Sequence, residues 1–249
     1  MIALIDYGMG NLRSVEKALV RVGGDVRIVS DRKSVLAADA LVLPGVGAFG
    51  DCMKNLQKFE LTDAIREFIQ SGKPFLGICL GLQSLFDSSE EAVGVAGLKI
   101  FRGTVPRFHF PNGGTGVPAC GSSQNAQAGT PVPPKLKVPH MGWNQIKILR
   151  PDCPLLRGIS TVGRPESFRG GEKGNAVSGD TAYSEPFVYF VHSYYPKPAD
   201  KSVVCATTTY GVEFCSIAWR DNVFATQFHP EKSQAVGLKM LENFVKLSK

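Results

Sequence analysis

The sequence predicts an α/β fold: an open, mostly parallel sheet with helices on both faces, extended by antiparallel strands. Short apolar runs alternate with helix-like segments in the first hundred residues, and strand-like segments with few helices between them follow in the second half. The 249 residues are 43% hydrophobic and 20% charged, which is typical of a folded protein with a substantial core. We expect a single domain over residues 1–249.

The first half of the chain carries the signals of a parallel sheet. Its predicted strands cover residues 2–6, 25–29, 40–43 and 73–78. Its predicted helices cover residues 12–22 and about 49–70, the second with a break near Glu60-Leu61. Since a helix between two strands carries the chain back to the same end of the sheet, these strands are expected to pair in parallel with helices on both faces.

The second half contains more strands than helices. Its predicted strands cover residues 144–149, 187–191, 203–209, 215–220 and 223–228, with a hairpin turn at Asp221-Asn222 before the last of them. Apolar residues at helical spacing from Val236 to Leu247 predict a closing amphipathic helix. These strands are expected to extend the parallel sheet in antiparallel fashion.

Two stretches interrupt this pattern, near residues 105–136 and 160–186. Both are rich in residues typical of loops and show no period, so we expect flexible loop inserts there. Few apolar residues anchor the first insert, which predicts that residues 107–134 can be replaced by a few Gly or Ser residues without loss of folding.

Composition and charge exclude several classes of protein. The formal net charge is +6, yet the basic residues form no run or helical stripe, so no nucleic-acid partner is expected. The longest uncharged apolar stretch, residues 74–86, is too short to span a membrane. Six cysteines without Cys-x-x-Cys spacing and four scattered histidines predict reduced thiols, no metal and no cofactor. The expected location is cytoplasmic.

A candidate nucleophile lies in the motif Gly77-Ile-Cys79-Leu-Gly81, between a predicted strand and a helix-like segment. Glycines on both sides permit the sharp turn that projects the central side chain from the sheet edge. The N–H of Leu80 then faces the same space and can bind an oxyanion. The beginning of a helix also favours the thiolate form of Cys79. A buried core cysteine is the alternative interpretation of this motif alone.

A base and an orienting acid are supplied by Phe228-His229-Pro230-Glu231. In an extended segment, His229 and Glu231 point to the same side, and Pro230 keeps the segment out of a helix. Glu231 can then accept a hydrogen bond from one imidazole nitrogen while the other faces the thiol. Alone, the motif favours a surface turn, but together with the Cys79 elbow it favours a catalytic pair. His192 is a candidate for a pocket wall and ranks below His229 as the base.

A third element is the glycine-rich turn at residues 43–49, at the end of a predicted parallel strand. Open α/β sheets bind ligands at that edge. Backbone N–H groups of Val46 and Gly47 can provide a second oxyanion donor opposite Leu80. No Gly-Lys-Ser/Thr follows, so the turn is not a phosphate loop.

Together, six ordered motifs resemble the class I (triad) glutamine amidotransferases, and among them the branch that serves histidine biosynthesis. They are residues 6–11 (DYGMGN), 44–49 (PGVGAF), 77–83 (GICLGLQ), 139–144 (PHMGWN), 189–194 (YFVHSY) and 227–233 (QFHPEKS). The resemblance covers almost the whole chain except the two inserts, and it implies the corresponding amidotransferase-like fold. The opening motif and Gly-Trp-Asn are typical of this branch.

The resemblance implies a role for each matching residue. Cys79 attacks the side-chain amide of glutamine, His229 moves the proton, and Glu231 orients His229. The residues expected to bind glutamine or its oxyanion are Val46, Gly47, Leu80, Gln83, Ser193 and Tyr194. The ammonia is expected to pass to a partner cyclase, a (β/α)8 barrel. The residues expected at or near that partner are Asn11, Trp143, Tyr189 and Lys232. Ordinary core packing and solvation are the alternative for these four.

Other functions remain open at this point. A sibling amidotransferase of another biosynthetic pathway has the same elbow, but residues 6–11 and 142–144 disfavour it. A cysteine hydrolase of the same fold is disfavoured by Gln83 and by Ser193-Tyr194. A non-enzymatic scaffold is expected to lose a member of the triad, and all three are present. The sequence leaves open whether the chain acts as a free subunit or as a domain of a fusion with the barrel.

Overall fold

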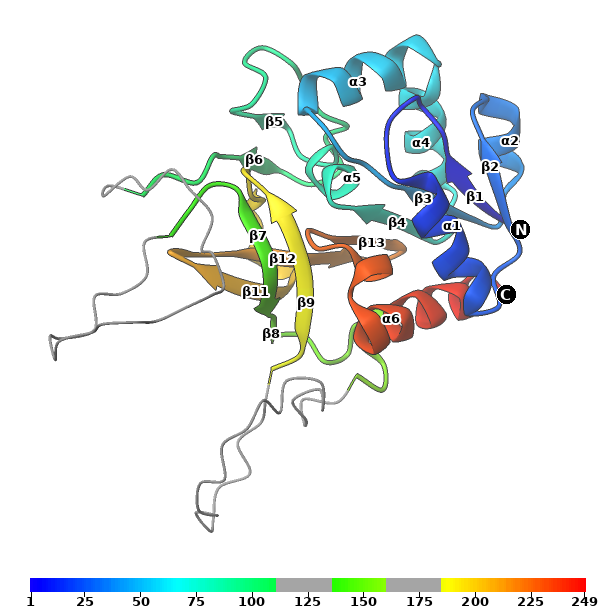
Figure 1. Ribbon diagram of the computed structural model, residues 1–249. Helices are drawn as coiled ribbons and strands as arrows, with labels where there is room; N and C mark the ends of the chain where they lie inside the picture. Colours follow the sequence, from blue (N-terminus) through cyan, green and yellow to red (C-terminus); the bar gives the residue numbers. More distant parts are fainter. Residues whose placement is uncertain (111–135, 160–184) are drawn as a thin grey trace, which may run out of the picture.

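The computed structural model describes residues 1–110, 136–159 and 185–249, and its largest element is an eight-stranded sheet (Figure 1). Its strands are β1 (Ile2–Ile5), β2 (Val26–Val29), β3 (Ala40–Leu43), β4 (Phe75–Ile78), β8 (Lys147–Ile148), β11 (Val204–Tyr210), β12 (Val212–Arg220) and β13 (Val223–Thr226). They lie in the order β2-β1-β3-β4-β13-β12-β11-β8. The strands from β2 to β13 pair in parallel, and β12, β11 and β8 continue the sheet in antiparallel fashion. The predicted fold class is confirmed.

Helices cover both faces of the parallel half (Figure 1). They are α1 (Leu12–Arg21), α2 (Arg32–Ala37), α3 (Phe49–Lys58), α4 (Leu61–Gln70), α5 (Leu80–Gln83) and α6 (Gln234–Leu247). Alternate residues of a strand point to opposite faces. Accordingly, Ala3 and Ile5 of β1 pack with the cluster that contains α2, α3 and α4, whereas Ile2 and Leu4 pack with α1 and α6.

The helix boundaries follow local signals. The break between α3 and α4 falls at Glu60 as predicted, where φ is +57°. Helix α2 is missing from the prediction because it is only six residues long and half of them are polar, although Asp31 caps it by accepting a hydrogen bond from the backbone N–H of Ser34 at 2.9 Å. Along the described stretches, none of the helices is both long and apolar enough to traverse a bilayer.

One prediction about the second half is wrong in its pairing. Residues 144–149 do not form a single strand of the main sheet, because the segment divides between β7 (His140–Gln145) and β8. Strand β7 pairs with β9 (Phe187–His192) in a separate antiparallel sheet, with His140 opposite His192. Phe190 of β9 packs edge-on against Phe214 of β12, so this small sheet covers the antiparallel half. Long-range side-chain packing of this kind decides the partner of a strand.

Three shorter strands form another sheet, and three 3₁₀ helices complete the described structure. The strands are β5 (Ser88–Ser89), β6 (Gly103–Val105) and β10 (Lys197–Pro198), in the order β10-β6-β5. The described 3₁₀ helices are η1 (Pro154–Leu156), η3 (Lys201–Val203) and η4 (Pro230–Lys232). The hairpin turn predicted at Asp221-Asn222 joins β12 to β13, and Asp221 has a φ of +52°.

The first predicted insert begins too early. Residues 103–105 form β6, the backbone N–H of Arg107 donates to Glu90 Oε2 at 2.9 Å, and Phe108 is only 2% exposed. Phe108 lies within an aromatic cluster that includes Tyr195 and Phe214. The composition of the segment suggested that its few apolar residues could not offset the entropy lost when it becomes ordered. Burial of the Phe108 ring provides that compensation. The remaining residues of the two predicted inserts, 111–135 and 160–184, lie outside the described residues.

The corrected boundary gives a prediction about stability. Phe108→Ala is expected to lower the free energy of unfolding by about 3–5 kcal/mol, because it removes a buried ring. Replacing residues 111–135 by a short Gly/Ser linker is expected to change it by about 1 kcal/mol or less. A short linker suffices because Phe110 and Leu136 both approach Gly211, which brings the flanks together. Urea unfolding of both variants measures the difference. A shortened chain as unstable as the Phe108 variant contradicts the prediction.

Candidate active site

The predicted elbow is present between β4 and α5. Cys79 is the residue between them and has φ +55° and ψ −106°, a conformation that L-residues rarely adopt. Its glycine neighbours have no room for a side chain. A Cβ at Gly77 meets the Gly81 carbonyl oxygen at 2.8 Å, and a Cβ at Gly81 meets the Leu43 carbonyl oxygen at 2.0 Å. The glycines therefore permit the close strand–helix approach that presents Cys79 at the sheet edge.

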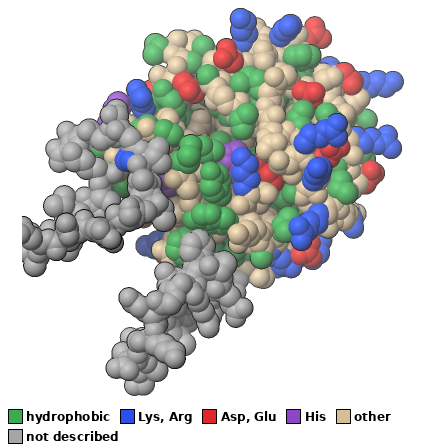
Figure 2. Space-filling model, in the orientation of Figure 1, with side chains coloured by type: hydrophobic (Ala, Val, Ile, Leu, Met, Phe, Trp, Pro, Cys, Tyr) green, Lys and Arg blue, Asp and Glu red, His purple; other side chains and the backbone are tan. Residues whose placement is uncertain are grey.

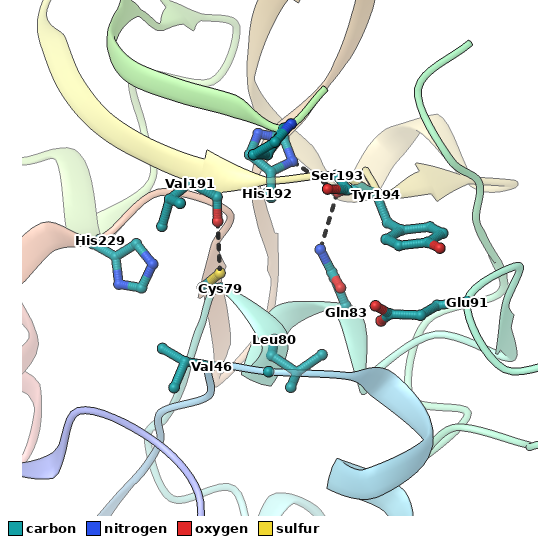
Figure 3. A pocket seen from close by; sticks show the side chains of 12 residues that line it. Val46, Cys79, Leu80, Gln83, Glu91, Val191, His192, Ser193, Tyr194 and His229 are labelled. Atoms are coloured by element: carbon teal, nitrogen blue, oxygen red, sulfur yellow. Dashed lines mark hydrogen bonds between the residues drawn. The ribbon is translucent and has the colours of Figure 1, made fainter. Parts of the chain in front are cut away.

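The base follows the neighbouring strand, β13. Strand β13 pairs with β4 in parallel, and the backbone N–H of Cys79 donates to the Thr226 carbonyl at 2.7 Å. The chain then leaves β13 and presents His229, whose Nδ1 lies 2.9 Å from Glu231 Oε1. Both side chains are buried, with 2% and 1% of their surface exposed. Figure 3 shows the His229 ring beside the Cys79 side chain.

The local conformation of the base differs from the prediction. Residues 229–231 are not extended throughout, because Pro230 begins the 3₁₀ helix η4. Proline favours the first position of a helical turn, where its missing N–H and fixed φ are tolerated. His229 itself remains extended, with φ −97° and ψ 98°. The predicted pairing of His229 with Glu231 therefore forms across a tight turn.

The electrostatics of His229 suit proton transfer. Burial lowers its pKa, but the charges and hydrogen-bonding groups of Cys79 and Glu231 outweigh burial and raise it to about 10. Since Glu231 takes Nδ1, the Nε2 atom is free for the proton that moves. Among the described residues, His229 Nε2 is a buried nitrogen without a hydrogen-bond partner. The arrangement fits a His229 imidazolium that holds the proton needed by a leaving group.

A cavity of about 310 Å³ opens beside these residues (Figure 3). All six residues predicted to bind a ligand or an oxyanion line it. They are Val46, Gly47, Leu80, Gln83, Ser193 and Tyr194. Glu91 and Val191, for which no role was predicted, also line the cavity. Glu91 follows no motif, so only the folded chain shows that it lines the same cavity as Cys79.

Two glutamine side chains connect the cavity wall to the nucleophile. Gln83 Nε2 donates to the Tyr194 carbonyl and to Gln227 Oε1, both at 3.0 Å. Gln227 Nε2 then lies 3.6 Å from Cys79 Sγ and donates to it. No role was predicted for Gln227 either, although its position directly before Phe228-His229 could have indicated that it belongs to the site. The two amides fix the position of the sulfur against the cavity wall.

The glycine-rich turn after β3 is suspended between two anchors. The Tyr7 hydroxyl donates to the Pro44 carbonyl at 3.0 Å, and the Phe49 N–H donates to Glu91 Oε2 at 2.8 Å. A Cβ at Gly45 meets the Leu80 side chain at 2.7 Å, and Gly47 has a φ of +99°. The turn therefore approaches the elbow closely enough for its peptide groups to face the same ligand as the Leu80 N–H.

Three of the four predicted partner residues gather on one surface. Trp143 and Tyr189 lie side by side on β7 and β9, with ring centroids 6.0 Å apart. Lys232 Nζ lies 5.9 Å from the centre of the Tyr189 ring. Asn11 precedes α1, and Lys17 and Arg21 of α1 line a second cavity together with Lys232. Figure 2 shows basic side chains over this face.

No metal site was found in the part of the chain that the structure describes. Among residues 1–110, 136–159 and 185–249, no three His, Cys, Asp or Glu side chains are grouped in a way that could hold a metal ion. The described cysteines are free and buried.

A family model described as "Glutamine amidotransferase class-I" matches residues 3–247 of the chain. The chain belongs to the class-I glutamine amidotransferase family. Its elbow, its buried His–Glu pair and its cavity all lie within the matched residues. Solved structures of remote relatives agree with the fold. The chain matches "Crystal structure of glutamine amidotransferase" with a TM-score of 0.63 at 15% identity, covering 100% of this chain and 99% of the other. It matches "Structure of PurLQS from Thermotoga maritima" with a TM-score of 0.65 at 15% identity, covering 100% and 98%.

Curated relatives share far more sequence with this amidotransferase. It is 49% identical to "Imidazole glycerol phosphate synthase subunit HisH" of Syntrophotalea carbinolica over 244 residues, which covers 98% of each chain. The protein of the same name from Geobacter sulfurreducens is 47% identical over 243 residues, covering 98% of this chain and 97% of the relative. The similarity therefore extends over nearly the whole of each aligned chain.

Proposed function

We propose that this chain is the glutaminase subunit of imidazole glycerol phosphate synthase and acts in histidine biosynthesis. The observation that carries the proposal is Cys79 on a strained elbow beside the buried His229–Glu231 pair, at the mouth of a cavity of about 310 Å³. The curated relatives, at up to 49% identity over 98% of each chain, support the choice of pathway. A cytoplasmic location, where thiols stay reduced, suits such a nucleophile.

The reaction is nucleophilic displacement at the glutamine side-chain amide. The Cys79 sulfur attacks the amide carbon, and the carbonyl oxygen becomes an oxyanion that the Leu80 N–H and the Val46–Gly47 turn stabilise. His229 gives its Nε2 proton to the departing nitrogen, which leaves as ammonia. A water then attacks the glutamyl thioester, with His229 as general base and Glu231 holding the imidazole. The products are glutamate and ammonia.

The cavity wall supplies one carboxylate and several neutral polar groups for the amino-acid end of glutamine. Glu91 provides the carboxylate for the α-ammonium group, and Gln83, Ser193 and Tyr194 line the same cavity. Glu91 Oε2 already accepts from the Phe49 N–H, which fixes the carboxylate in place before substrate arrives. A preorganised carboxylate binds the ammonium without paying for its own ordering.

The ammonia goes to a partner cyclase, a (β/α)8 barrel as a subunit or a fused domain. There it reacts with a phosphoribulosyl-formimino ribonucleotide to give imidazole glycerol phosphate and an aminoimidazole carboxamide ribotide. Trp143, Tyr189 and Lys232 form an aromatic and basic surface beside the His229–Glu231 turn, and Asn11 begins the helix next to it. Aromatic and basic anchors are typical of protein interfaces.

The test is reconstitution with a cyclase barrel and its ribonucleotide substrate. With glutamine as the nitrogen source, glutamate and imidazole glycerol phosphate are expected in equal amounts. Glutamate formation without imidazole glycerol phosphate, although the barrel accepts ammonium salts, contradicts the assigned pathway and favours a sibling amidotransferase. No glutamate under any condition contradicts the glutaminase itself and favours a hydrolase with another substrate.

Glu231→Gln is expected to lower kcat/KM for glutamine by about 10²–10⁴-fold, because the base keeps its position in the chain but loses its orienting carboxylate. Since the charge of Glu231 helps to raise the pKa of His229, its loss lowers that pKa. The alkaline limb of the kcat/KM profile should therefore move to lower pH. Rates from pH 6 to pH 10 measure both effects. The control is Glu242→Gln, a change on the outer part of α6; equal losses in both variants contradict the role of Glu231.

A further inference from the structure

Two buried histidines, His140 and His192, have no role in the mechanism above. We infer that they form a neutral positioning relay, which holds the Tyr194 carbonyl and with it the wall of the glutamine cavity. They are 2% and 6% exposed and lie opposite each other on β7 and β9. The relay acts within the proposed glutaminase and rests on that function.

The relay begins at an asparagine whose orientation is fixed. Asn144 Oδ1 accepts from the backbone N–H of Gln145 at 2.8 Å, and its Nδ2 donates to the Thr209 carbonyl at 3.1 Å. The same Nδ2 lies 3.2 Å from His140 Nε2. An amide nitrogen can only donate, so His140 Nε2 must accept.

This contact sets the tautomer of both rings. With Nε2 as an acceptor, neutral His140 carries its proton on Nδ1 and donates to His192 Nε2, at 2.9 Å. His192 then carries its own proton on Nδ1, which lies 2.7 Å from the Tyr194 carbonyl oxygen and donates to it. With these tautomers, each N–H from Asn144 through His140 to His192 donates to an acceptor. All of these hydrogen bonds therefore point the same way, from Asn144 toward the Tyr194 carbonyl.

Both rings remain neutral at physiological pH. Burial lowers the pKa of His140 to about 4, and burial together with the nearby His140 lowers the pKa of His192 to about 3. A second proton on His140 would place an N–H against the Asn144 amide, which also donates. The hydrogen bonds of the relay thus keep the same donors and acceptors throughout the pH range in which a cysteine–histidine pair works.

The Tyr194 carbonyl depends on side chains for its hydrogen bonds. The backbone of residues 106–108 holds its neighbours, since the Phe108 N–H donates to Ser193 O and the Tyr195 N–H donates to Pro106 O. His192 and Gln83 donate to the Tyr194 carbonyl itself (Figure 3). Because Gln83 also reaches Cys79 through Gln227, the carbonyl joins the cavity wall to the nucleophile.

Space filling is the competing role for His192. The rings pack in an aromatic cluster, with Phe214 5.2 Å from His192 and Tyr210 4.0 Å from His140 between ring centroids. Space filling and hydrogen bonding to Tyr194 predict opposite rankings of KM when His192 is replaced by asparagine or by glutamine. Asparagine places its NH₂ near the position of Nδ1 and can still donate to Tyr194. Glutamine fills more of the ring volume but places its amide near Nε2, facing His140.

The experiment compares His192→Asn with His192→Gln in the full chain bound to the cyclase barrel and ribonucleotide. The asparagine variant is expected to keep KM for glutamine within about threefold of the parent, whereas the glutamine variant raises KM about tenfold, as for the loss of one hydrogen bond. kcat is expected to change less than KM. His109→Gln, at an exposed histidine, is the matched control. The same ranking for His140→Asn and His140→Gln supports the relay.

Equal KM values for the asparagine and glutamine variants, or a lower KM for glutamine, overturn the relay. A direct readout is the nitrogen NMR spectrum of histidine-labelled protein at pH 7. Both His140 and His192 are expected as neutral Nδ1–H tautomers, and an Nε2–H or charged form of either ring overturns the relay even when a variant fails to fold. If the parent and His109→Gln release no glutamate, the proposed function fails, while the spectrum still decides the tautomers.

Discussion

Cys79→Ala is expected to abolish glutamine hydrolysis while the complex still makes imidazole glycerol phosphate from ammonium salts. The sulfur forms the covalent bond to the substrate, so its loss should lower kcat by roughly 10⁴–10⁶-fold, the range found when one member of a catalytic triad is removed. The ribonucleotide chemistry takes place in the barrel, which needs only ammonia. Glutamate release and imidazole glycerol phosphate formation, each with both nitrogen sources, measure the two halves separately.

The matched control is Cys153→Ala, at a buried cysteine just before η1. It should retain both activities, which shows that loss of a buried thiol alone is harmless. Glutaminase activity that survives Cys79→Ala contradicts the assigned nucleophile. Simultaneous loss of the ammonium-dependent reaction would instead show that the change disrupts the complex, and it would contradict the separation of roles between the subunits.

The second large effect concerns activation by the partner. The isolated chain is expected to hydrolyse glutamine slowly, and the barrel with bound ribonucleotide to accelerate it by about 10²–10³-fold, the value of one oxyanion donor. The turn around Val46 is the element that can supply this donor. Gly45 and Gly47 flank Val46, and the turn is held at Pro44 by Tyr7 and at Phe49 by Glu91.

A rotation of the peptide between these two anchors redirects one N–H without moving the sheet. Glycine permits such a rotation because it reaches both signs of φ at little energetic cost. The measurement is kcat/KM for glutamine of the free chain, of the chain with the barrel, and of the chain with the barrel and ribonucleotide. A free chain that already works at the rate of the full complex contradicts gating by this turn.

The features predicted best from the sequence are those determined by residues that are close together in the chain. The glycines around Cys79 have one structural purpose, a sharp strand–helix turn, and the spacing of His229 and Glu231 allows them to pair. Alternation of apolar runs and helices was sufficient for the parallel strands β1 to β4, whereas β13, which was predicted among the antiparallel strands, pairs with β4 in parallel. In each of these cases the deciding residues are neighbours in the chain.

The features missed depend on residues that are distant in the sequence. Glu91 contributes to the cavity because the loop after β5 passes the start of α3, and no local pattern in the sequence indicates this contact. Phe108 was assigned to an insert because its aromatic partners come from residues about a hundred positions later. The pairing of β7 with β9 likewise joins distant segments, with His140 opposite His192. Tertiary packing decides such cases, and a single sequence shows it poorly.

The position of β13 in the sheet has a consequence for synthesis of the chain. It is the last strand in sequence, yet it lies between β4 and β12 and is hydrogen-bonded to both. Until residues 223–226 leave the ribosome, a nascent chain has two open strand edges where the finished protein has a continuous sheet. Such edges invite pairing with other chains. A chain terminated before β13 is therefore not a smaller enzyme but an aggregation-prone and protease-sensitive fragment.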